Sequence, residues 1–267
     1  MKKYGVIGRG RLGSLLLQRD GFFSLKCDLT DQKSIWDAVE ALTPDIIVNL
    51  AAISNLDECE KDYNCAIKVN VDGVTNLHKV FGDKVITFST AHVFNGRSCR
   101  NKENSLVSPV NSYGFTKVGA EAISDAFGGK VIRFSRTVSI EDADISEWLL
   151  ALYKDETINP PSFMYRNFIH RQFAIDGIVY FVENYDRMPH LIHYGGLDNC
   201  NFYTFMLLLA EKFGFDRNLI VPRKKDNPSY VPRPKNGDFS VSLAKKLGFP
   251  MYSVGNTVLR LANEANL

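Results

Sequence analysis

The chain has 267 residues, of which 45% are hydrophobic and 12% aromatic, so it is long enough to bury a sizeable core. Its formal net charge of +2 disfavours nonspecific binding to nucleic acid, which requires a concentrated basic face. The glycine-rich N-terminus has no apolar run suited to a secretory signal or a membrane span, so we expect a cytoplasmic protein without nucleic-acid or membrane partners. The five cysteines and five histidines show neither CxxC nor HExxH spacing, and we expect reduced thiols and no catalytic metal.

The first half of the chain alternates short β-branched runs with helical patterns, which is typical of βαβ units in a parallel sheet. The predicted strands cover residues 4–7, 22–27, 46–52, 84–89 and 130–135, and the predicted helices cover 11–19, 34–42, 66–81 and 112–127. After Arg136 the alternation loosens, with helical patterns at 148–153, 173–184 and 202–213 and a strand at 191–194. Four prolines between 222 and 234 predict a loop or arm.

This order predicts an α/β fold with a doubly wound, Rossmann-like parallel sheet and a smaller C-terminal substrate-binding lobe. We assign residues 1–136 and about 171–198 to a dinucleotide-binding domain. Residues from about 137 to 170 and from 199 to 267 are assigned to the smaller lobe.

A glycine turn follows the first predicted strand. It reads Gly8-Arg9-Gly10-Arg11-Leu12-Gly13, the GxGxxG pattern that lets the backbone approach a pyrophosphate. Its position between a strand and a helix favours dinucleotide binding over a purely structural turn. Arg9 and Arg11 are candidates for holding a 2′-phosphate, which favours NADP over NAD, although arginines are also common at helix starts without such a role.

The second predicted strand ends close to an acidic cluster. Asp28 lies only fifteen positions after Gly13, where a ribose-binding acid normally follows by roughly 20 residues. Asp28 is the candidate for that contact. Either the second strand is abbreviated or the ribose acid is missing. The alternative, that Asp28 and Asp31 only start the next helix as caps, fits Thr30 or Asp31 and is compatible with a cofactor contact.

Tyr113 and Lys117 are four residues apart and therefore share one face of the predicted helix. A nearby ammonium stabilises a phenolate, so we expect Lys117 to bring the pKa of Tyr113 toward the working range. YxxxK by itself is common on solvated helix faces. Ser89 and Thr90 strengthen the functional interpretation, because they end a buried strand at the sheet edge where ligands bind and can hold a substrate carbonyl.

Several stretches together resemble the extended short-chain dehydrogenases, and most of all the dTDP-4-dehydrorhamnose reductase family. They are Pro44-Asp45-Ile46-Ile47-Val48-Asn49-Leu50-Ala51-Ala52, Val69-Asn70, Ser89-Thr90-Ala91-His92-Val93-Phe94-Asn95-Gly96, Ser108-Pro109 through Tyr113 to Lys117, and Arg233-Pro234-Lys235-Asn236.

The resemblance implies reduction of a keto group on a nucleotide-activated sugar by NADP or NAD. Thr90, Tyr113 and Lys117 would form the catalytic triad, with Tyr113 protonating the ketone oxygen. The implied cofactor contacts are the glycine turn together with Asp28, Leu29, Leu50, Ala51, Ala52, Asn70, Ser89, Tyr113 and Lys117. The implied substrate contacts are Ser89, Thr90, His92, Tyr113, Arg136 and Arg233, with Arg233 suited to a nucleotide diphosphate. A homodimer is also considered.

The chain departs from the family pattern on the sugar side. Ala91 and His92 replace an aspartate and a tyrosine, an aromatic residue is replaced near Arg136, and the glycine turn is one residue shorter. His92 is a candidate substrate ligand or auxiliary acid, or else a loop histidine with a structural hydrogen bond. Tyr165, Arg166 and His170 are further substrate candidates.

Two other functions remain open from the sequence. One is an epimerase or dehydratase of the same superfamily, although the absence of an acidic pair beside Thr90 disfavours a dehydratase. The other is a non-catalytic subunit that keeps the fold and binds a dinucleotide or a protein partner.

Overall fold

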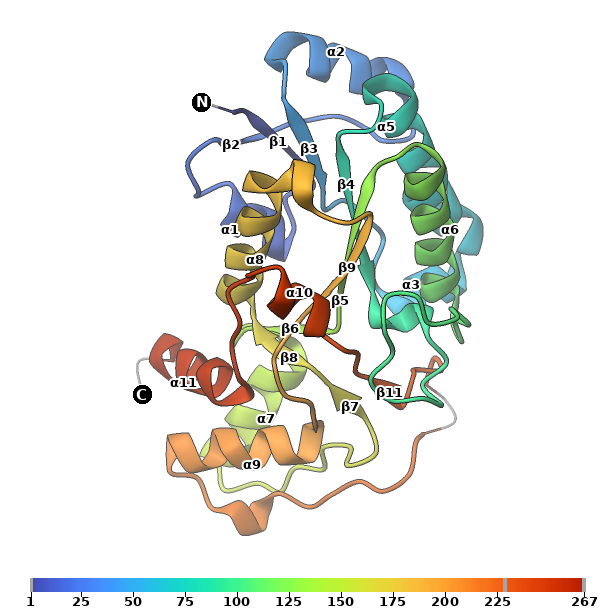
Figure 1. The fold of residues 1–267 in the computed structure, drawn as a ribbon. Coiled ribbons are helices and arrows are strands. Elements are labelled where there is room, and N and C mark those ends of the chain that lie inside the picture. Colours follow the sequence, from blue (N-terminus) through green and yellow to red (C-terminus); the bar gives the residue numbers. More distant parts are fainter. Residues whose placement is uncertain (1, 228–229, 266–267) are drawn as a thin grey trace.

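A six-stranded parallel sheet forms the centre of the computed structural model, which describes residues 2–227 and 230–265 (Figure 1). The strand order is β2-β1-β3-β4-β5-β9, and the predicted α/β parallel-sheet class is confirmed. The strands are β2 (Phe22–Ser24), β1 (Tyr4–Ile7), β3 (Ile46–Asn49), β4 (Val85–Thr90), β5 (Lys130–Phe134) and β9 (Leu191–Tyr194). From β1 the chain turns to β2 on one side and then returns to β3 on the other. β1 and β3 pair along their whole length, but the segments that leave their carboxyl ends run to opposite faces of the sheet, which is the point where open α/β sheets bind ligands.

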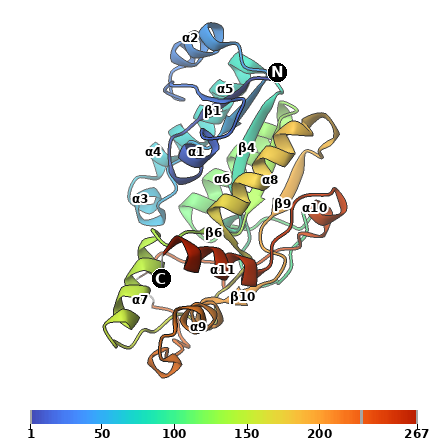
Figure 2. The same cartoon turned by 90° about the vertical axis from the view of Figure 1, so that its left-hand side faces the viewer.

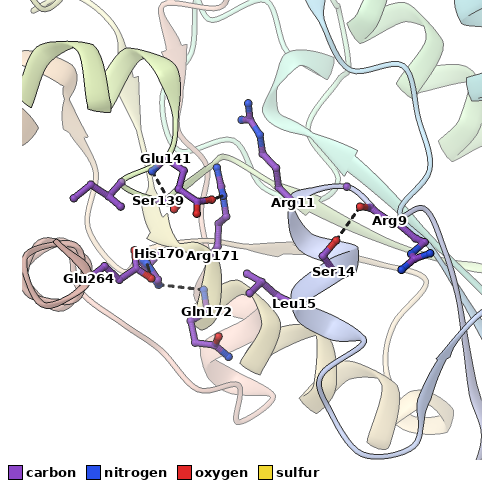
Figure 3. Close-up of a pocket in the computed structure, with 12 residues that line it drawn as sticks. Arg9, Arg11, Ser14, Leu15, Ser139, Glu141, His170, Arg171, Gln172 and Glu264 are labelled. Atoms are coloured by element: carbon purple, nitrogen blue, oxygen red, sulfur yellow. Dashed lines mark hydrogen bonds and ion pairs between the residues drawn. The ribbon is translucent and has the colours of Figure 1, made fainter. Parts of the chain in front are cut away.

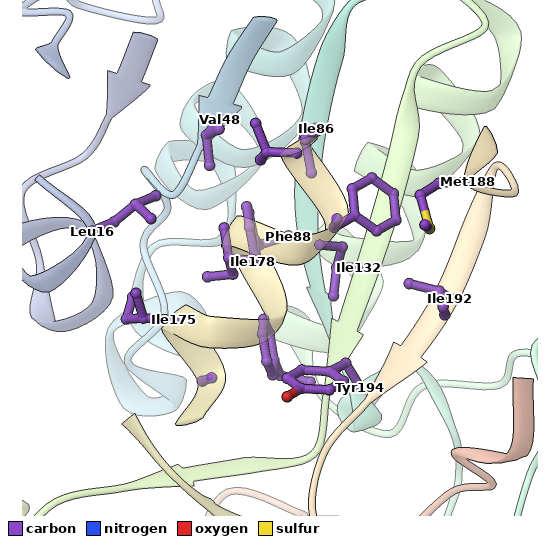
Figure 4. Packing of buried hydrophobic residues seen from close by; sticks show 14 of the residues in the cluster. Leu16, Val48, Ile86, Phe88, Ile132, Ile175, Ile178, Met188, Ile192 and Tyr194 are labelled. Atoms are coloured by element: carbon purple, nitrogen blue, oxygen red, sulfur yellow. The ribbon is translucent and has the colours of Figure 1, made fainter. Parts of the chain in front are cut away.

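Helices cover both faces of this sheet. One face carries α1 (Arg11–Leu16) and α8 (Arg171–Glu183), and the other carries α2 (Gln32–Leu42), α5 (Gly73–Phe81) and α6 (Ser112–Ala126). Ile175 and Ile178 of α8 belong to one buried cluster with Ile86 and Ile132 of the strands (Figure 4). Alternate strand residues are buried on opposite faces, which explains why the strands read as continuous apolar runs.

A second group of elements lies beyond the carboxyl edge of the sheet (Figures 1 and 2). Its hydrophobic cluster joins three helices: α7 (Ala143–Tyr153), α9 (Phe202–Phe213) and α11 (Val254–Glu264). Short strands accompany them, with β6 (Arg136–Val138) paired to β8 (Phe168–His170), and β7 (Tyr165–Arg166) lying between β10 (Cys200–Asn201) and β11 (Asn236–Gly237). The division into two lobes stays a prediction.

The remaining elements are short: α3 (Leu56–Lys61), α4 (Tyr63–Ile67), a π-helix at Lys68–Asp72, α10 (Ser242–Lys246), and 3₁₀ turns at Ala91–Val93, Tyr185–Arg187 and Arg217–Leu219. The described part of the proline-rich stretch 222–234 contains neither helix nor strand, as predicted; residues 228 and 229 lie outside the described residues. Within the part of the chain that the structure describes, no helix combines the length and apolar character needed to cross a bilayer.

The predicted helix over 66–81 is helical throughout, but it contains a π turn that the pattern did not indicate. The chain forms α4, the π-helix and α5 in succession, and Asn70 lies in the wide π turn. The Asn70 side chain bonds both the amide and the carbonyl of Ile53, at 2.8 and 2.9 Å, and also Thr116 at 3.0 Å. These contacts hold the loop after β3 against α6, and π turns of this kind concentrate at functional sites.

A buried ion pair connects α6 to the sheet. Both carboxylate oxygens of Glu121 accept hydrogen bonds from Arg133 of β5, at 2.7 and 2.6 Å. Arg133 also contacts His193 of β9 at 3.1 Å. Glu121 lies one helical turn after Lys117. The ion pair of Glu121 with Arg133 therefore fixes the position of Tyr113 and Lys117 relative to the ends of the strands.

Glu121→Ala should lower the free energy of unfolding by about 3–5 kcal/mol, because it leaves the Arg133 guanidinium buried without a counterion. Asp37→Ala is the matched control, since its ion pair with Lys33 is exposed and its loss should cost below about 1 kcal/mol. Urea denaturation measures both. Equal costs for the two variants would contradict the role given to the buried pair.

Candidate active site

A cleft opens at the carboxyl edge of the sheet and reaches from the glycine turn to α6. Its volume of about 780 Å³ suits a cofactor-sized ligand. Its lining residues are Gly8, Gly10, Arg11, Leu12, Gly13, Asn49, Leu50, Ala51, Ala52, Ser54, Asn55, Phe88, Ser89, Thr90, Tyr113, Lys117, Phe134, Ser135 and Thr137.

The cleft brings together the predicted triad and most of the predicted cofactor contacts. Ten predicted site residues are not among those that line it: Arg9, Asp28, Leu29, Asn70, His92, Arg136, Tyr165, Arg166, His170 and Arg233. Of these, Asn70 holds the wall of the cleft through Ile53, and Leu29 is buried against Gly73 of α5.

The glycine turn has the shape that a bound dinucleotide requires. Gly8 has φ +96°, and a Cβ on it would lie 2.6 Å from the Ala51 amide nitrogen, so that glycine is required by the fold itself. A Cβ on Gly13 would collide with the Gly8 carbonyl. A Cβ on Gly10, in contrast, would meet no atom within 4 Å. The free space above Gly10 suits the close approach of a pyrophosphate to the backbone.

The Asp28 carboxylate is hydrogen-bonded to a residue close to it in the chain. It accepts hydrogen bonds from the amide and the hydroxyl of Thr30, both at 2.8 Å, and these hold its pKa below the ordinary value. Asp31 caps α2 by accepting from the Lys33 amide at 2.9 Å, as the capping alternative predicted. The ribose contact of Asp28 stays a prediction.

Tyr113 and Lys117 share one face of α6, and both lie deep in the cleft. Burial raises the pKa of Tyr113 above its ordinary value, while a hydrogen bond from the Thr90 side chain acts in the opposite direction. Burial lowers the pKa of Lys117 to about 8. The pKa of Tyr113 is raised and not lowered as expected, because the loss of solvation is the largest cause and Lys117 is not among the groups that shift it. The phenol keeps its proton at neutral pH, which is the state a proton donor needs.

The end of β4 supplies two hydroxyls. Ser89 Oγ is buried and has no hydrogen-bond partner among the described residues, so it is free to bond a ligand in the cleft. Thr90 Oγ1 accepts from the His92 amide at 3.2 Å, which leaves the hydroxyl proton of Thr90 to be donated toward Tyr113 or a substrate oxygen.

A basic cluster, formed by Arg136, Arg166 and Arg233, lies near His92, next to Tyr113. The His92 ring packs edge-on to the Tyr113 ring, with centroids 5.8 Å apart. Burial lowers the pKa of His92 to about 3, and the charges of Arg166, Arg233 and Arg136 act in the same direction. Arg136 is compensated by Asp144 at 2.7 Å. Within the described residues, neither Arg166 nor Arg233 has a carboxylate partner within 4.0 Å.

Comparison with known proteins agrees with this arrangement. The family model for the RmlD substrate binding domain matches residues 8–265. The chain belongs to the RmlD substrate-binding domain family. The family resemblance expected from the motifs is thereby confirmed.

Three individual proteins illustrate the family. The chain is 27% identical over 165 residues to a dTDP-4-dehydrorhamnose reductase of Aggregatibacter actinomycetemcomitans, covering 58% of this chain and 56% of that protein. It is 33% identical over 100 residues to methionine adenosyltransferase 2 subunit beta of Danio rerio, covering 37% of this chain and 31% of that protein. A crystal structure of dTDP-4-dehydrorhamnose reductase from Bacillus anthracis in complex with NADP has the same fold, with a TM-score of 0.88, 20% identity, and coverage of 99% of this chain and 100% of that one.

This RmlD family member has a second cavity of about 600 Å³ on the other side of the glycine turn (Figure 3). Arg9, Arg11, Glu141, His170 and Arg171 are among its lining residues. Arg11 also donates to the carboxylate of Asp142 at 2.8 Å, and that carboxylate, which is 1% exposed, pairs with Arg171 as well. The ion pairs connect the glycine turn to the segment after β6 and to the start of α8. His170, a predicted substrate candidate, lies here and not beside Tyr113.

The sequence interpretation missed several cleft residues. Ser54 and Asn55 follow β3, and Phe134, Ser135 and Thr137 lie at the end of β5 and in β6. Their signal was available, because side chains directly after neighbouring parallel strands meet at one sheet edge. Asn111, immediately before α6, was also missed, although asparagine before a helix is a common cap.

The depressed pKa of Lys117 predicts a specific pH dependence of stability. Below pH 8 the buried ammonium destabilises the folded state, and this cost disappears as the pH rises from about 8 toward 10.5, where the unfolded chain also loses the proton. Lys117→Met should therefore be more stable than the wild type at pH 7, and its advantage should shrink between pH 8 and 10.5. Parallel denaturant titrations across this range test the difference, and a gap that does not change with pH would contradict it.

Proposed function

We propose that the protein reduces a keto group on a nucleotide-activated sugar with NADPH or NADH. The observation that carries the proposal is the single cleft that joins the glycine turn to Thr90, Tyr113 and Lys117. Membership of the RmlD family and the related dTDP-4-dehydrorhamnose reductase indicate an NAD(P)-dependent oxidoreductase.

The residues of the chain divide the chemistry between them. A reduced nicotinamide, when bound, supplies the hydride to the carbonyl carbon. Tyr113 donates its proton to the carbonyl oxygen, because burial keeps the phenol protonated at neutral pH. Thr90 orients the carbonyl through its free hydroxyl proton. Lys117 lies one helical turn away in the same cleft and is a proposed contact of the cofactor.

The basic cluster supports a substrate with a diphosphate. Arg166 is buried, and its guanidinium donates to the carbonyls of Tyr165 and Lys235 while burial lowers its pKa to about 9. Arg233 is exposed beside the Tyr230 ring. Two cations without carboxylate partners create a strong preference for an anionic ligand, and guanidinium groups match phosphate oxygens. Together they would hold the nucleotide diphosphate and leave the sugar beside His92 and Tyr113.

The cofactor preference, assembly and location complete the proposal. NADP is favoured over NAD because Arg9 and Arg11 flank the glycine turn and Arg9 has no ion-pair partner among the described residues. Asp28, Leu29 and Asn70 stay proposed cofactor contacts. A cytoplasmic homodimer is the proposed form.

A second function is supported by a specific comparison. Methionine adenosyltransferase 2 subunit beta is a subunit by its name, and it matches part of this chain. The same fold could therefore act without turnover as a dinucleotide-binding subunit. The retained Thr90, Tyr113 and Lys117, gathered in one cleft, favour the enzyme.

Tyr113→Phe should lower kcat for keto-sugar-nucleotide reduction by about 10²–10⁴-fold, because it removes the proton donor, and should leave the Kd for NADPH unchanged. NADPH oxidation and a fluorescence titration measure these two quantities. Tyr63→Phe, on the exposed face of α4, is the matched control and should have no effect.

Three outcomes would each contradict a different part of the proposal. Unchanged turnover of Tyr113→Phe removes Tyr113 from the mechanism. NADPH binding without oxidation across a panel of 4-keto sugar nucleotides favours the non-catalytic subunit. Product formation without net NADPH consumption indicates an epimerase.

Arg233→Ala should weaken the binding of dTDP to the NADP-loaded protein by about tenfold or more, because it removes a charged hydrogen-bond donor from the diphosphate. Calorimetry measures the Kd. Arg217→Ala, which removes another exposed arginine from the 3₁₀ turn Arg217–Leu219, should leave it unchanged. Equal losses in both variants would point to general electrostatic attraction and against a diphosphate site at Arg233.

A further inference from the structure

Asn111 connects three parts of the candidate site. It is 3% exposed and occupies the N-cap position of α6, two residues before Tyr113. Its Oδ1 accepts a hydrogen bond from the Gly114 amide at 2.8 Å. Its Nδ2 lies 2.8 Å from the carbonyl of Pro232 and 3.0 Å from Nδ1 of His92.

Two of these partners determine the orientation of the amide. The Gly114 N–H is only a donor, so it must face the amide oxygen, and the Pro232 carbonyl is only an acceptor, so it must face the amide nitrogen. The group 3.0 Å from His92 Nδ1 is therefore an NH₂ donor. Nδ1 must accept, which assigns the ring proton to Nε2.

The Nε2–H of His92 has no partner among the described residues, so this tautomer leaves a donor available. The ring stacks edge-on to Tyr113, and the His92 backbone carbonyl lies so close to Gly114 that a Cβ there would collide with it. Thr90 holds the His92 amide. The histidine is thus fixed from the side of β4 and from the side of α6.

One partner of Asn111, Pro232, belongs to the proline-rich stretch 222–234, which we call the arm. Pro232 directly precedes Arg233, so the hydrogen bond to the Pro232 carbonyl ties the backbone beside Arg233 to the start of α6. The Asn111 side chain therefore links the backbone beside Arg233, the residue proposed to bind the diphosphate, to His92 and to the start of α6, which carries Tyr113.

We propose that Asn111 is a positioning residue that holds His92 beside Tyr113 as a neutral Nε2–H donor for a ligand and ties the backbone next to Arg233 to the start of α6. The proposal rests on the proposed function for the identity of the ligand. It makes His92 a specificity-determining donor and excludes the role of an auxiliary acid.

The charges around His92 agree with a neutral ring. Arg136 of β6, Arg166 of β7 and Arg233 of the arm face it as cations, and Tyr113 of α6 faces it as a protonated phenol. Burial, followed by repulsion from the three arginines, lowers the pKa of His92 to about 3. An imidazolium would also have to give up the hydrogen bond that Nδ1 accepts from Asn111.

Asn111→Asp separates this role from helix capping. The carboxylate keeps an acceptor for the Gly114 amide and is itself a good N-cap, but it cannot donate to Pro232 or His92. The ¹⁵N shifts of the His92 ring should change from the Nε2–H tautomer to a form protonated at Nδ1. The Kd of dTDP for the NADP-loaded protein should rise by about tenfold, with the Kd of NADP unchanged.

Two further variants control for altered folding. Ser112→Ala removes the hydroxyl bonded to Glu60 at 2.8 Å, at the same helix end, and should change neither the His92 tautomer nor dTDP binding. Asn111→Ser retains a capping hydroxyl too short to reach both other partners, and should weaken dTDP binding as Asn111→Asp does. In the His92→Gln background, Asn111→Asp should have a smaller effect than in the wild type, because the two residues act together.

The outcomes are distinct. If His92 keeps its Nε2 proton in Asn111→Asp, or if the variants change Tm but not dTDP affinity, Asn111 is a helix cap only and the proposal is overturned. If wild-type protein binds neither dTDP nor UDP, the proposed function fails at its substrate. In that case the tautomer still decides whether Asn111 holds His92.

Discussion

The structure depends on a close backbone contact between the glycine turn and the segment that leaves β3. Gly8 packs so tightly on Ala51 that no side chain fits between them, and Gly13 closes on the Gly8 carbonyl in the same way. These contacts bring the ends of β1 and β3 together at the point where the strand order reverses. The wall formed by Ala51 and Ala52, the hydroxyls at the end of β4 and the Tyr113 side chain are then arranged along one continuous cleft.

Much of this could be predicted from local patterns. The βαβ alternation, the glycine turn and the Tyr113-Lys117 spacing each follow from short-range rules, and β1, β9 and α9 begin and end where the patterns indicated. The π turn around Asn70 could not be predicted, because its cause is a set of hydrogen bonds to Ile53 and Thr116, which are distant in sequence. The short strands of the second group, such as β7 and β11, are two residues long and carry no periodicity to detect.

Burial explains where electrostatic reasoning from the sequence was wrong. The spacing of Tyr113 and Lys117 suggests mutual stabilisation of their charged forms, but both side chains lose most of their hydration, and each is driven toward its neutral form. The pKa values of His92 and Arg166 are also lowered by burial, and neighbouring arginines lower them further. His92 lies after β4 and Arg166 lies in β7. The sequence places these residues 74 positions apart, and only the tertiary structure makes them neighbours.

The glycines of the turn are constrained for two different reasons, and the empty space above Gly10 shows the difference. Gly8 and Gly13 are required for the chain to fold, whereas the backbone at Gly10 is in a conformation open to other residues and has room for a methyl group. A substitution at Gly10 should not destabilise the fold, so the variant should not be removed as a misfolded protein. Substitutions at Gly10 should therefore give a folded, stable protein, whereas substitutions at Gly8 or Gly13 should destabilise the fold itself.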